Sequence, residues 1–411
     1  MRILHVHKYY HDHDGAGRYL FDVMRLEEQA GHAVAIFAMH DPRNLQSAWD
    51  KYFVSSLDTS HVGYGIDMFR QLGRALWSFE ARRKMKAMLK AFRPDVVHLH
   101  NAYTHLSPSV LVACRAQCVP VVMTVHDYAL VSANYGLWSG QRPLTPENLK
   151  LLTVARSRYI KNSFIATLAL ELIYRFHKAL KLYDRAIDVY LPSSEFVKQT
   201  LVKAGYPANK MTVLPLFAGN FLSGVEAPPP VSSTAREGIL FSGRLETYKG
   251  VDLFLQAAET FPKTKFFMTG TGPLEAQVRD AQARLDNFEY LGYLSSQELW
   301  ALMARVQLVM VPSRWAEPYG LVAIEAMACG TPVVMSDAGG LPEKVKDGVN
   351  GLIFKAGDIQ DLNSLLKRAL KHPEDLERMG QGAFRYAKAN ADPNKHISKL
   401  FEVYDGVVIH K

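Results

Sequence analysis

Short apolar runs rich in β-branched residues alternate with helix-period segments along this chain, and the alternation occurs twice. In the first half the strand-like runs are residues 3–6, 33–38, 96–99, 119–125, 189–192 and 211–214, and helical periodicity covers 19–29 and 69–92. In the second half the strand-like runs are residues 238–242, 265–269, 288–291, 308–312, 331–335 and 351–354. Such alternation indicates parallel strands joined by crossover helices. We therefore predict an α/β chain with two doubly wound sheets.

A proline-rich break separates the two halves. Three consecutive prolines occupy 228–230 beside a Ser/Thr cluster, which is typical of a linker. A chain of 411 residues also exceeds what one compact core usually holds. We expect ligands in a central cleft, where the carboxyl ends of the two sheets face each other. The predicted parts are an N-terminal domain over 1–218, a linker over 219–236, a C-terminal domain over 237–390, and a C-terminal helix over 391–411 that crosses back to the N-terminal domain.

Charge and cysteine usage restrict the partners and the compartment. The net charge is +8, and the basic excess lies in the first half. This indicates an anionic partner, which could be nucleic acid, a phospholipid surface or a pyrophosphate-linked acceptor, or else a solvated basic face without a partner. The sequence contains no run of about 18 apolar residues, so no transmembrane helix is predicted. Cys114 and Cys118 lie four apart in an expected helix and Cys329 is remote, a pattern that favours a reducing compartment and hence the cytoplasm.

The segment over 313–330 carries the strongest signal of a binding site. Glu317 and Glu325 are eight apart, and Pro318 and Gly320 after the first are typical of a loop that enters a helix. Free amide groups at such a helix start suit a diphosphate, with Glu317 on sugar hydroxyls and Glu325 on ribose hydroxyls. The alternative is a surface glutamate followed by an amphipathic helix. The amides expected at this anion site belong to Tyr319, Gly320, Leu321 and Val322.

Two further loops of the second half have the composition of a nucleotide site. Arg244 and Lys249 follow the expected strand 238–242 and precede a helix, where two cations can stabilise a pyrophosphate leaving group. Gly270 and Gly272 follow the next strand and allow a nucleotide to approach the backbone. Solvated charges and an ordinary glycine turn are the alternatives.

Gly15 and Gly17 lie between the first strand and the first helix of the N-terminal half. They resemble a dinucleotide fingerprint, but Leu20 stands where the third glycine is needed, so a nicotinamide enzyme is disfavoured. The same loop could meet a phosphate across the cleft. Asp12-His13-Asp14 has the D-x-D pattern of metal-dependent glycosyl transfer. We discount this match because the motif belongs to a different fold from the two doubly wound sheets expected here.

Histidines concentrate in the N-terminal half. His126 directly follows the run 119–125 and is expected to project into the cleft; a strand-end histidine bonded to backbone is the alternative. His5 and His7 share one strand face, as do His98 and His100, and we interpret these histidines as an acceptor pocket that bonds sugar hydroxyls. No C-x2-C spacing of the kind found in zinc sites occurs in the sequence.

Together these segments resemble the retaining glycosyltransferases of family 4, of the bacterial surface-polysaccharide type, over essentially the whole chain. The resemblance is most specific over 313–352, where EAMACGTPVV, GGLPE and DGVNGLIF occur in order. It implies a GT-B fold of two Rossmann-like domains, the first binding the acceptor and the second the nucleotide-sugar. It also implies roles for individual residues: Arg244 and Lys249 on the diphosphate, Glu325 on the ribose, Glu317 and His126 on the donor sugar, Gly270, Gly272, Tyr293 and Leu294 near the base, and Gly15 and Gly17 on the phosphates. Many such enzymes carry a cysteine-rich insertion after the HDY segment, and this chain lacks it.

The predicted function is transfer of a hexose from a nucleoside-diphosphate sugar to a saccharide or lipid-linked saccharide in polysaccharide biosynthesis, with retention of configuration. The expected catalytic residues are His126, Glu317, Arg244 and Lys249; neither a metal nor another cofactor is expected. The base and sugar stay open between GDP-mannose and UDP-hexoses. The alternatives are a GT-B-fold sugar-nucleotide epimerase and a non-catalytic assembly subunit. Basic stretches over 70–93 and 142–185 contain interleaved aromatic residues and suggest contact with the anionic inner face of the cytoplasmic membrane. We expect no nucleic acid partner.

Overall fold

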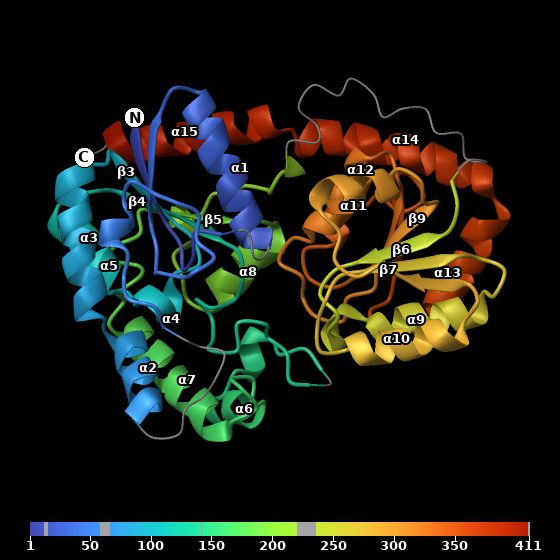
Figure 1. Ribbon diagram of the computed structural model, residues 1–411, viewed down its shortest axis with the longest axis horizontal. Helices are drawn as coiled ribbons and strands as arrows, with labels where there is room; N and C mark the ends of the chain where they lie inside the picture. Colours follow the sequence, from blue (N-terminus) through green and yellow to red (C-terminus); the bar gives the residue numbers. More distant parts are fainter. Residues whose placement is uncertain (12–14, 58–65, 141, 220–235, 410–411) are drawn as a thin grey trace. The chain divides into compact units, whose positions relative to one another are not determined.

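The computed structural model describes residues 1–11, 15–57, 66–140, 142–219 and 236–409, which form two compact units (Figure 1). The first unit comprises Met1–Ser139, Leu144–Leu214 and Asn394–Lys411. The second comprises Gly140–Pro143 and Pro215–Pro393. Most of the expected linker, and the Asp12-His13-Asp14 motif, lie outside the described residues.

The first unit contains a five-stranded parallel sheet. Its order is β2-β1-β3-β4-β5, so the direction in which strands are added reverses between β1 and β3. Every residue of β3 and β4 is buried, as expected for strands covered by helices on both faces. The strands are β1 Arg2–Val6, β2 Ala33–Phe37, β3 Val96–Leu99, β4 Val121–Val125 and β5 Val189–Pro192.

The run over 211–214 is not a strand, contrary to the prediction. Thr212 donates to the Tyr190 carbonyl and Leu214 donates to the Pro192 carbonyl, both at 3.0 Å, and Met211 makes an isolated bridge. In a parallel ladder the amide of residue 192 would donate back to Thr212. Proline has no amide hydrogen, so the ladder is interrupted there.

Helices cover the first sheet, and one expected helical stretch is divided. Residues 69–92 form two helices because Ser78 begins a new one, its side chain accepting a hydrogen bond from the Ala81 amide. Cys118 lies just beyond the end of its expected helix, and none of the three cysteines forms a disulfide. The helices are α1 Gly15–Gln29, α2 Ile66–Leu76, α3 Phe79–Phe92, α4 Tyr103–Leu106, α5 Ser109–Ala116, α6 Leu151–Arg156, α7 Phe164–Ala179, α8 Glu195–Lys203 and α15 Pro393–Ile409.

The second unit contains a six-stranded parallel sheet of order β11-β10-β9-β6-β7-β8. Its core packs Phe254 between Phe241 and Phe266. Both expected doubly wound sheets are therefore confirmed. The strands are β6 Ile239–Ser242, β7 Phe266–Thr269, β8 Phe288–Tyr290, β9 Leu308–Val311, β10 Val333–Ser336 and β11 Gly351–Phe354. The helices are α9 Val251–Thr260, α10 Glu275–Arg284, α11 Ser296–Met303, α12 Leu321–Ala328, α13 Ile359–Lys371 and α14 Pro373–Asn390.

Candidate active site

The order of the second sheet reverses between β6 and β9, and the loops after these two strands carry the expected donor residues. β6 is followed by Arg244 and by a 3-10 turn that ends at Lys249. β9 is followed by the loop that contains Glu317. Ligands of doubly wound sheets bind at the carboxyl ends of strands at such a reversal. The topology thus brings together side chains that are 68 residues apart in the chain.

Glu317 and Lys249 form an ion pair in which the carboxylate is buried and the lysine is half-buried. The Lys249 Nζ lies 2.5 Å from Glu317 Oε1 and 4.9 Å from the centre of the Trp315 ring. Ser313 Oγ donates to the same carboxylate oxygen at 2.8 Å, and Glu317 is only 5% exposed. Burial disfavours the charged carboxylate, but Lys249, Trp315 and Ser313 together hold the pKa of Glu317 below its ordinary value. Glu317 is therefore an ionised acceptor of hydrogen bonds.

Two arginines of the same loops, Arg244 and Arg314, differ in their exposure and in their partners. Arg244 is largely exposed and pairs with Glu246 at 3.1 Å. Arg314 instead holds both oxygens of Asp252 at 2.6 Å, and so ties the loop after β9 to α9. The sequence prediction singled out Arg244 and missed Arg314, because no local pattern reveals a partner 62 residues away.

Lys344 is a second residue that the sequence analysis missed. Its Nζ donates to the Gly340 carbonyl at 2.7 Å and lies 4.0 Å from the centre of the Tyr319 ring. Burial lowers the pKa of Lys344 to about 7, although the charges of Glu343 and Glu317 oppose that shift. Lys344 directly follows the GGLPE segment over 339–343, and this position in the sequence could have marked it as a candidate site residue. The same segment contacts the Glu317 loop, because the Gly340 amide donates to the Glu317 carbonyl at 2.8 Å.

Helix α12 begins one residue after Gly320, as the sequence predicted. Gly320 has φ 81° and lies at the N-cap, so the helix starts with Leu321. Glu325 lies within α12 and is buried, and Tyr319 just before the helix donates to the Leu216 carbonyl at 2.7 Å. The start of α12 and the Glu317 loop are thus continuous in the chain, with both glutamates buried.

The glycine turn after β7 packs on the loop after β6. Gly270 has φ 127°, and a Cβ at this position would collide with the Gly243 carbonyl oxygen. The amide of Leu245 donates to Thr271 at 2.9 Å, which joins the two loops. Gly272 ends the same turn. The loop after β8 contains the exposed Tyr293 and the half-buried Leu294.

Gly15 and Gly17 lie in the first turn of α1, not in the loop that the sequence predicted. Gly17 is buried, and Gly15 is half-buried. Glycine is a poor helix former, which is why the pattern favoured a loop there.

His126 follows β4 directly and is half-buried. Its Nε2 lies 3.1 Å from Nδ1 of His100, and the two rings stack with centres 5.4 Å apart. Tyr19 of α1 makes an edge contact with the His126 ring. The neighbouring Asp127 accepts a hydrogen bond from the Ala129 amide at 2.9 Å. His100 thus holds the His126 ring in place, and the sequence alone could not predict this contact.

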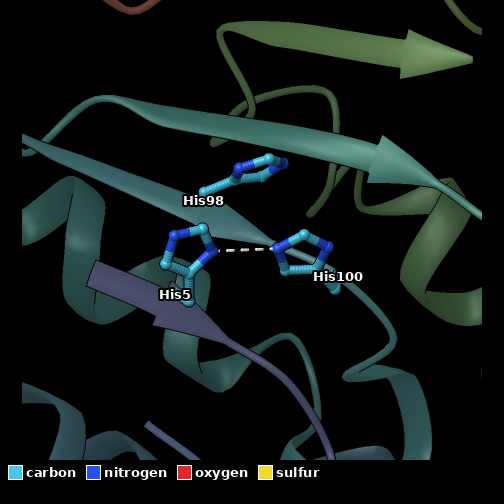
Figure 2. A group of neighbouring side chains, drawn as sticks. All are labelled: His5, His98 and His100. Atoms are coloured by element: carbon cyan, nitrogen blue, oxygen red, sulfur yellow. Dashed lines mark hydrogen bonds between the residues drawn. The ribbon is translucent and has the colours of Figure 1, made fainter. Parts of the chain in front are cut away.

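His100, the partner of His126, also belongs to a cluster with His5 and His98 (Figure 2). All three side chains are fully buried. Figure 2 shows His5 and His100 joined by a hydrogen bond, which is 3.0 Å long. Because none of the three is exposed, the predicted acceptor pocket of histidines is wrong for these residues.

The basic stretches contain an exposed apolar stripe. On α7 the side chains of Leu172 and Phe176 are about half exposed, while Glu171 and His177 on the other face are buried. Helix α7 packs on α2 and α6 (Figure 1). Within the described residues, no helix is long and apolar enough to cross a membrane. The remaining exposed apolar side chains of these helices and their ends are Phe69, Leu76, Phe79, Leu152, Ile165 and Leu180.

Comparison with protein-family models gives two matches that together span most of the chain. The model described as Glycosyltransferase Family 4 matches residues 13–217. The model described as Glycosyl transferases group 1 matches residues 228–386. The chain is also 27% identical to a glycogen synthase from Mycobacterium tuberculosis over 411 aligned positions, which cover 95% of this chain and 90% of that enzyme.

Solved structures with the same architecture cover the whole chain. HepE from Anabaena in complex with UDP and glucose has a TM-score of 0.69 at 18% identity, covering 99% of this chain and 100% of that one. Sucrose-phosphate synthase from Thermosynechococcus elongatus has a TM-score of 0.71 at 17% identity, covering 100% of both chains. At these identities the likeness establishes the fold.

Proposed function

This chain belongs to the group 1, family 4 glycosyltransferases and has their GT-B fold, and from that premise we propose that it transfers a hexose from a nucleoside-diphosphate sugar to a saccharide or lipid-linked saccharide, with retention, in polysaccharide biosynthesis. The observation that carries the proposal is the ion pair of the buried Glu317 with Lys249 at the reversal point of the second sheet.

The donor occupies the second unit in this proposal. The ionised carboxylate of Glu317 accepts hydrogen bonds from sugar hydroxyls, and Glu325 accepts those of the ribose. Arg244, which is exposed, and Lys249 neutralise the diphosphate together with the amides at the start of α12. The base lies near the loops after β7 and β8, with Gly270, Gly272, Tyr293 and Leu294. In the first unit, His126 contacts the donor sugar, and Gly15 and Gly17 line the phosphates.

The proposed reaction is a front-face displacement. The acceptor oxygen bonds to the anomeric carbon while the bond from that carbon to the phosphate oxygen breaks, and the acceptor proton passes to the departing phosphate. Arg244 and Lys249 stabilise the charge that develops on that phosphate. Because these cations can balance the leaving group, we propose that the reaction needs neither a metal nor another cofactor.

A saccharide acceptor is supported by the relatives. One relative is a glycogen synthase, and the structure of HepE is a complex with UDP and glucose. The family matches do not favour the two alternatives, a sugar-nucleotide epimerase and a non-catalytic subunit. An epimerase would act without an acceptor, so a strict acceptor requirement for turnover also separates the proposals.

The test is a thermal-shift and hydrolysis screen against GDP, UDP, ADP, dTDP and their sugars, with EDTA present. We expect one nucleoside diphosphate to raise the Tm, and Arg244→Ala and Lys249→Ala to abolish that rise. Arg378→Ala and Lys265→Ala are matched controls, because both residues form exposed ion pairs elsewhere in the second unit. No shift with any nucleotide would favour the non-catalytic alternative, and dependence on an added divalent ion would contradict metal independence.

The exposed stripe on α7 favours a second role for the first unit. We propose that Leu172, Phe176 and the adjacent cations Arg175 and Lys178 dock this face on an anionic membrane, where a lipid-linked acceptor resides. Flotation with vesicles that contain anionic lipid should recover the protein, and Leu172→Glu with Phe176→Glu should prevent it. Leu45→Glu, another exposed leucine of the first unit, is the control. Equal absence from neutral and anionic vesicle fractions would end this proposal.

A further inference from the structure

A continuous row of hydrogen bonds runs through the interior of the first unit and ends at His126. Glu27 Oε2 lies 2.6 Å from His5 Nε2. His5 Nδ1 lies 3.0 Å from His100 Nε2, and His100 Nδ1 lies 3.1 Å from His126 Nε2. Glu27, His5 and His100 are fully buried, whereas His126 is half-buried. The row therefore joins a buried carboxylate to the ring expected at the donor sugar.

Strand register builds this row. His5 of β1 pairs in register with His98 of β3, so the two side chains lie on one face of the sheet. His100 lies two residues beyond His98 and points to the same side. Glu27 comes from α1, which covers that face, and its Oε2 reaches His5. Four separate elements thus supply the four members.

Glu27 fixes the proton positions on a side branch. A carboxylate only accepts hydrogen bonds, and the Tyr404 hydroxyl donates to Glu27 Oε1 at 2.9 Å. Tyr404 must therefore accept from His98 Nδ1, 2.6 Å away. His98 Nε2 is then an acceptor and takes the hydrogen of the Thr124 hydroxyl at 2.7 Å. Burial, together with neighbouring histidines, lowers the pKa of His98 well below its ordinary value, which agrees with this neutral ring.

The same reasoning orders the protons along the row. His5 donates its Nε2 hydrogen to Glu27, and in one continuous arrangement of the row its Nδ1 accepts from His100 Nε2. Burial and neighbouring histidines lower the pKa of His100 well below its ordinary value, so that ring is neutral as well. Since His100 Nε2 carries the hydrogen, its Nδ1 accepts from His126 Nε2. In this arrangement the tautomer of His126 follows from a carboxylate three hydrogen bonds away.

We propose that Glu27, His5 and His100 are positioning residues that hold His126 as its Nε2–H tautomer, so that His126 Nδ1 is the nitrogen that accepts a hydrogen bond from a sugar hydroxyl. This inference deepens the proposed function and rests on it for the identity of the ligand.

A metal ion is the competing use of this cluster. One nitrogen from each of His5, His98 and His100 lies within 4.8 Å of the others (Figure 2). However, both nitrogens of His98 already bond to Tyr404 and Thr124. The His98 and His100 rings also stack, with centres 4.2 Å apart at 29°. The hydrogen-bond row therefore explains the cluster better.

The test is long-range ¹H–¹⁵N NMR of the full chain with labelled histidine, which reports the tautomer of each ring. We expect the Nε2–H form for His126. Glu27→Gln is the decisive variant, because its amide oxygen can accept from Tyr404 while its nitrogen donates to His5. That donation reverses every member of the row, so His126 should become the Nδ1–H form. We expect kcat to fall by about 10- to 100-fold, while the KM for the donor stays within about threefold.

A pair of His100 variants separates positioning from packing. His100→Asn keeps an amide oxygen near the position of Nδ1 and should retain the His126 tautomer, whereas His100→Phe fills the space and should lose it. An unchanged His126 tautomer in Glu27→Gln, an Nδ1–H ring in the unmodified protein, or stoichiometric zinc in the purified protein would each overturn the inference. Because the tautomer is read without turnover, a reversed row in a protein that transfers no sugar would reject the proposed function and not the row.

Discussion

Glu317 is a buried carboxylate whose charge is balanced mainly by one lysine, so the effect of changing either residue depends on the other. Lys249 Nζ and Ser313 Oγ both reach Glu317 Oε1. Removing one partner of a buried pair leaves a charge without compensation, whereas removing both charges does not. The same pair that we propose to bind the donor therefore also contributes to folding stability.

Lys249→Met should destabilise the protein by about 1–3 kcal/mol, because Glu317 would remain buried without its cation. The double variant with Glu317→Gln should recover most of that loss, which a double-mutant cycle in urea measures. Lys265→Met is the control, since its pair with Glu237 is exposed and should change stability by less than about 0.5 kcal/mol. Strictly additive effects of the two substitutions would contradict a coupled pair.

Lys344 predicts a pH dependence of stability with a definite sign. Its pKa is about 7 in the folded protein and about 10.5 ordinarily, so between these values the unfolded chain binds more protons. Stability should therefore rise with pH from about 7 to about 10.5. Lys344→Met should be more stable than the unmodified protein by about 1–4 kcal/mol near pH 7, and the difference should disappear towards pH 10. Urea unfolding across this range measures it, and the exposed Lys346→Met should show no such trend.

At the scale of elements, the sequence predicted strands better than tertiary partners. All six strands of the second sheet lie within a residue or two of their predicted positions, because buried strands are apolar runs bounded by turns. The strand predicted over 211–214 was wrong and the break at Ser78 was not predicted, since each depends on one residue: a proline without an amide hydrogen and a helix cap. The partners of Lys344 and His126 could not be predicted, because register and topology place them.

The glycine turn after β7 is an element whose geometry requires glycine. Gly270→Ala should destabilise by more than about 2 kcal/mol, because its Cβ would meet the Gly243 carbonyl at a left-handed φ of 127°. Gly292→Ala is the matched control: φ is 66° and no atom lies within 4 Å of its Cβ, so only the conformational cost of about 1 kcal/mol applies. Thermal unfolding in the presence and absence of nucleotide compares them. Equal losses in the two variants would show that the close approach to Gly243 is unimportant.

At the scale of the whole molecule, the last helix belongs to the unit in which the chain began. Helix α15 follows the second unit in sequence, yet from Asn394 onward it is part of the first unit. Its Leu400 and Tyr404 are fully buried, and Tyr404 bonds to both Glu27 and His98. The first unit is therefore complete only after α15 has been made.

Truncation after Pro393 should unfold the first unit and leave the second folded. The lost burial of Ile397, Leu400 and Tyr404 amounts to roughly 5–8 kcal/mol as an upper bound, which is comparable with the total stability of a domain. Glu27 and His98 would also lose their shared partner. Amide hydrogen exchange should show lost protection in β1, β3 and β4 and retained protection in β6 and β9, whereas truncation after Ile409 should change neither. Retained protection in the first sheet would mean that α15 is not needed for its stability, and the buried hydrogen-bond row would then have to persist without Tyr404.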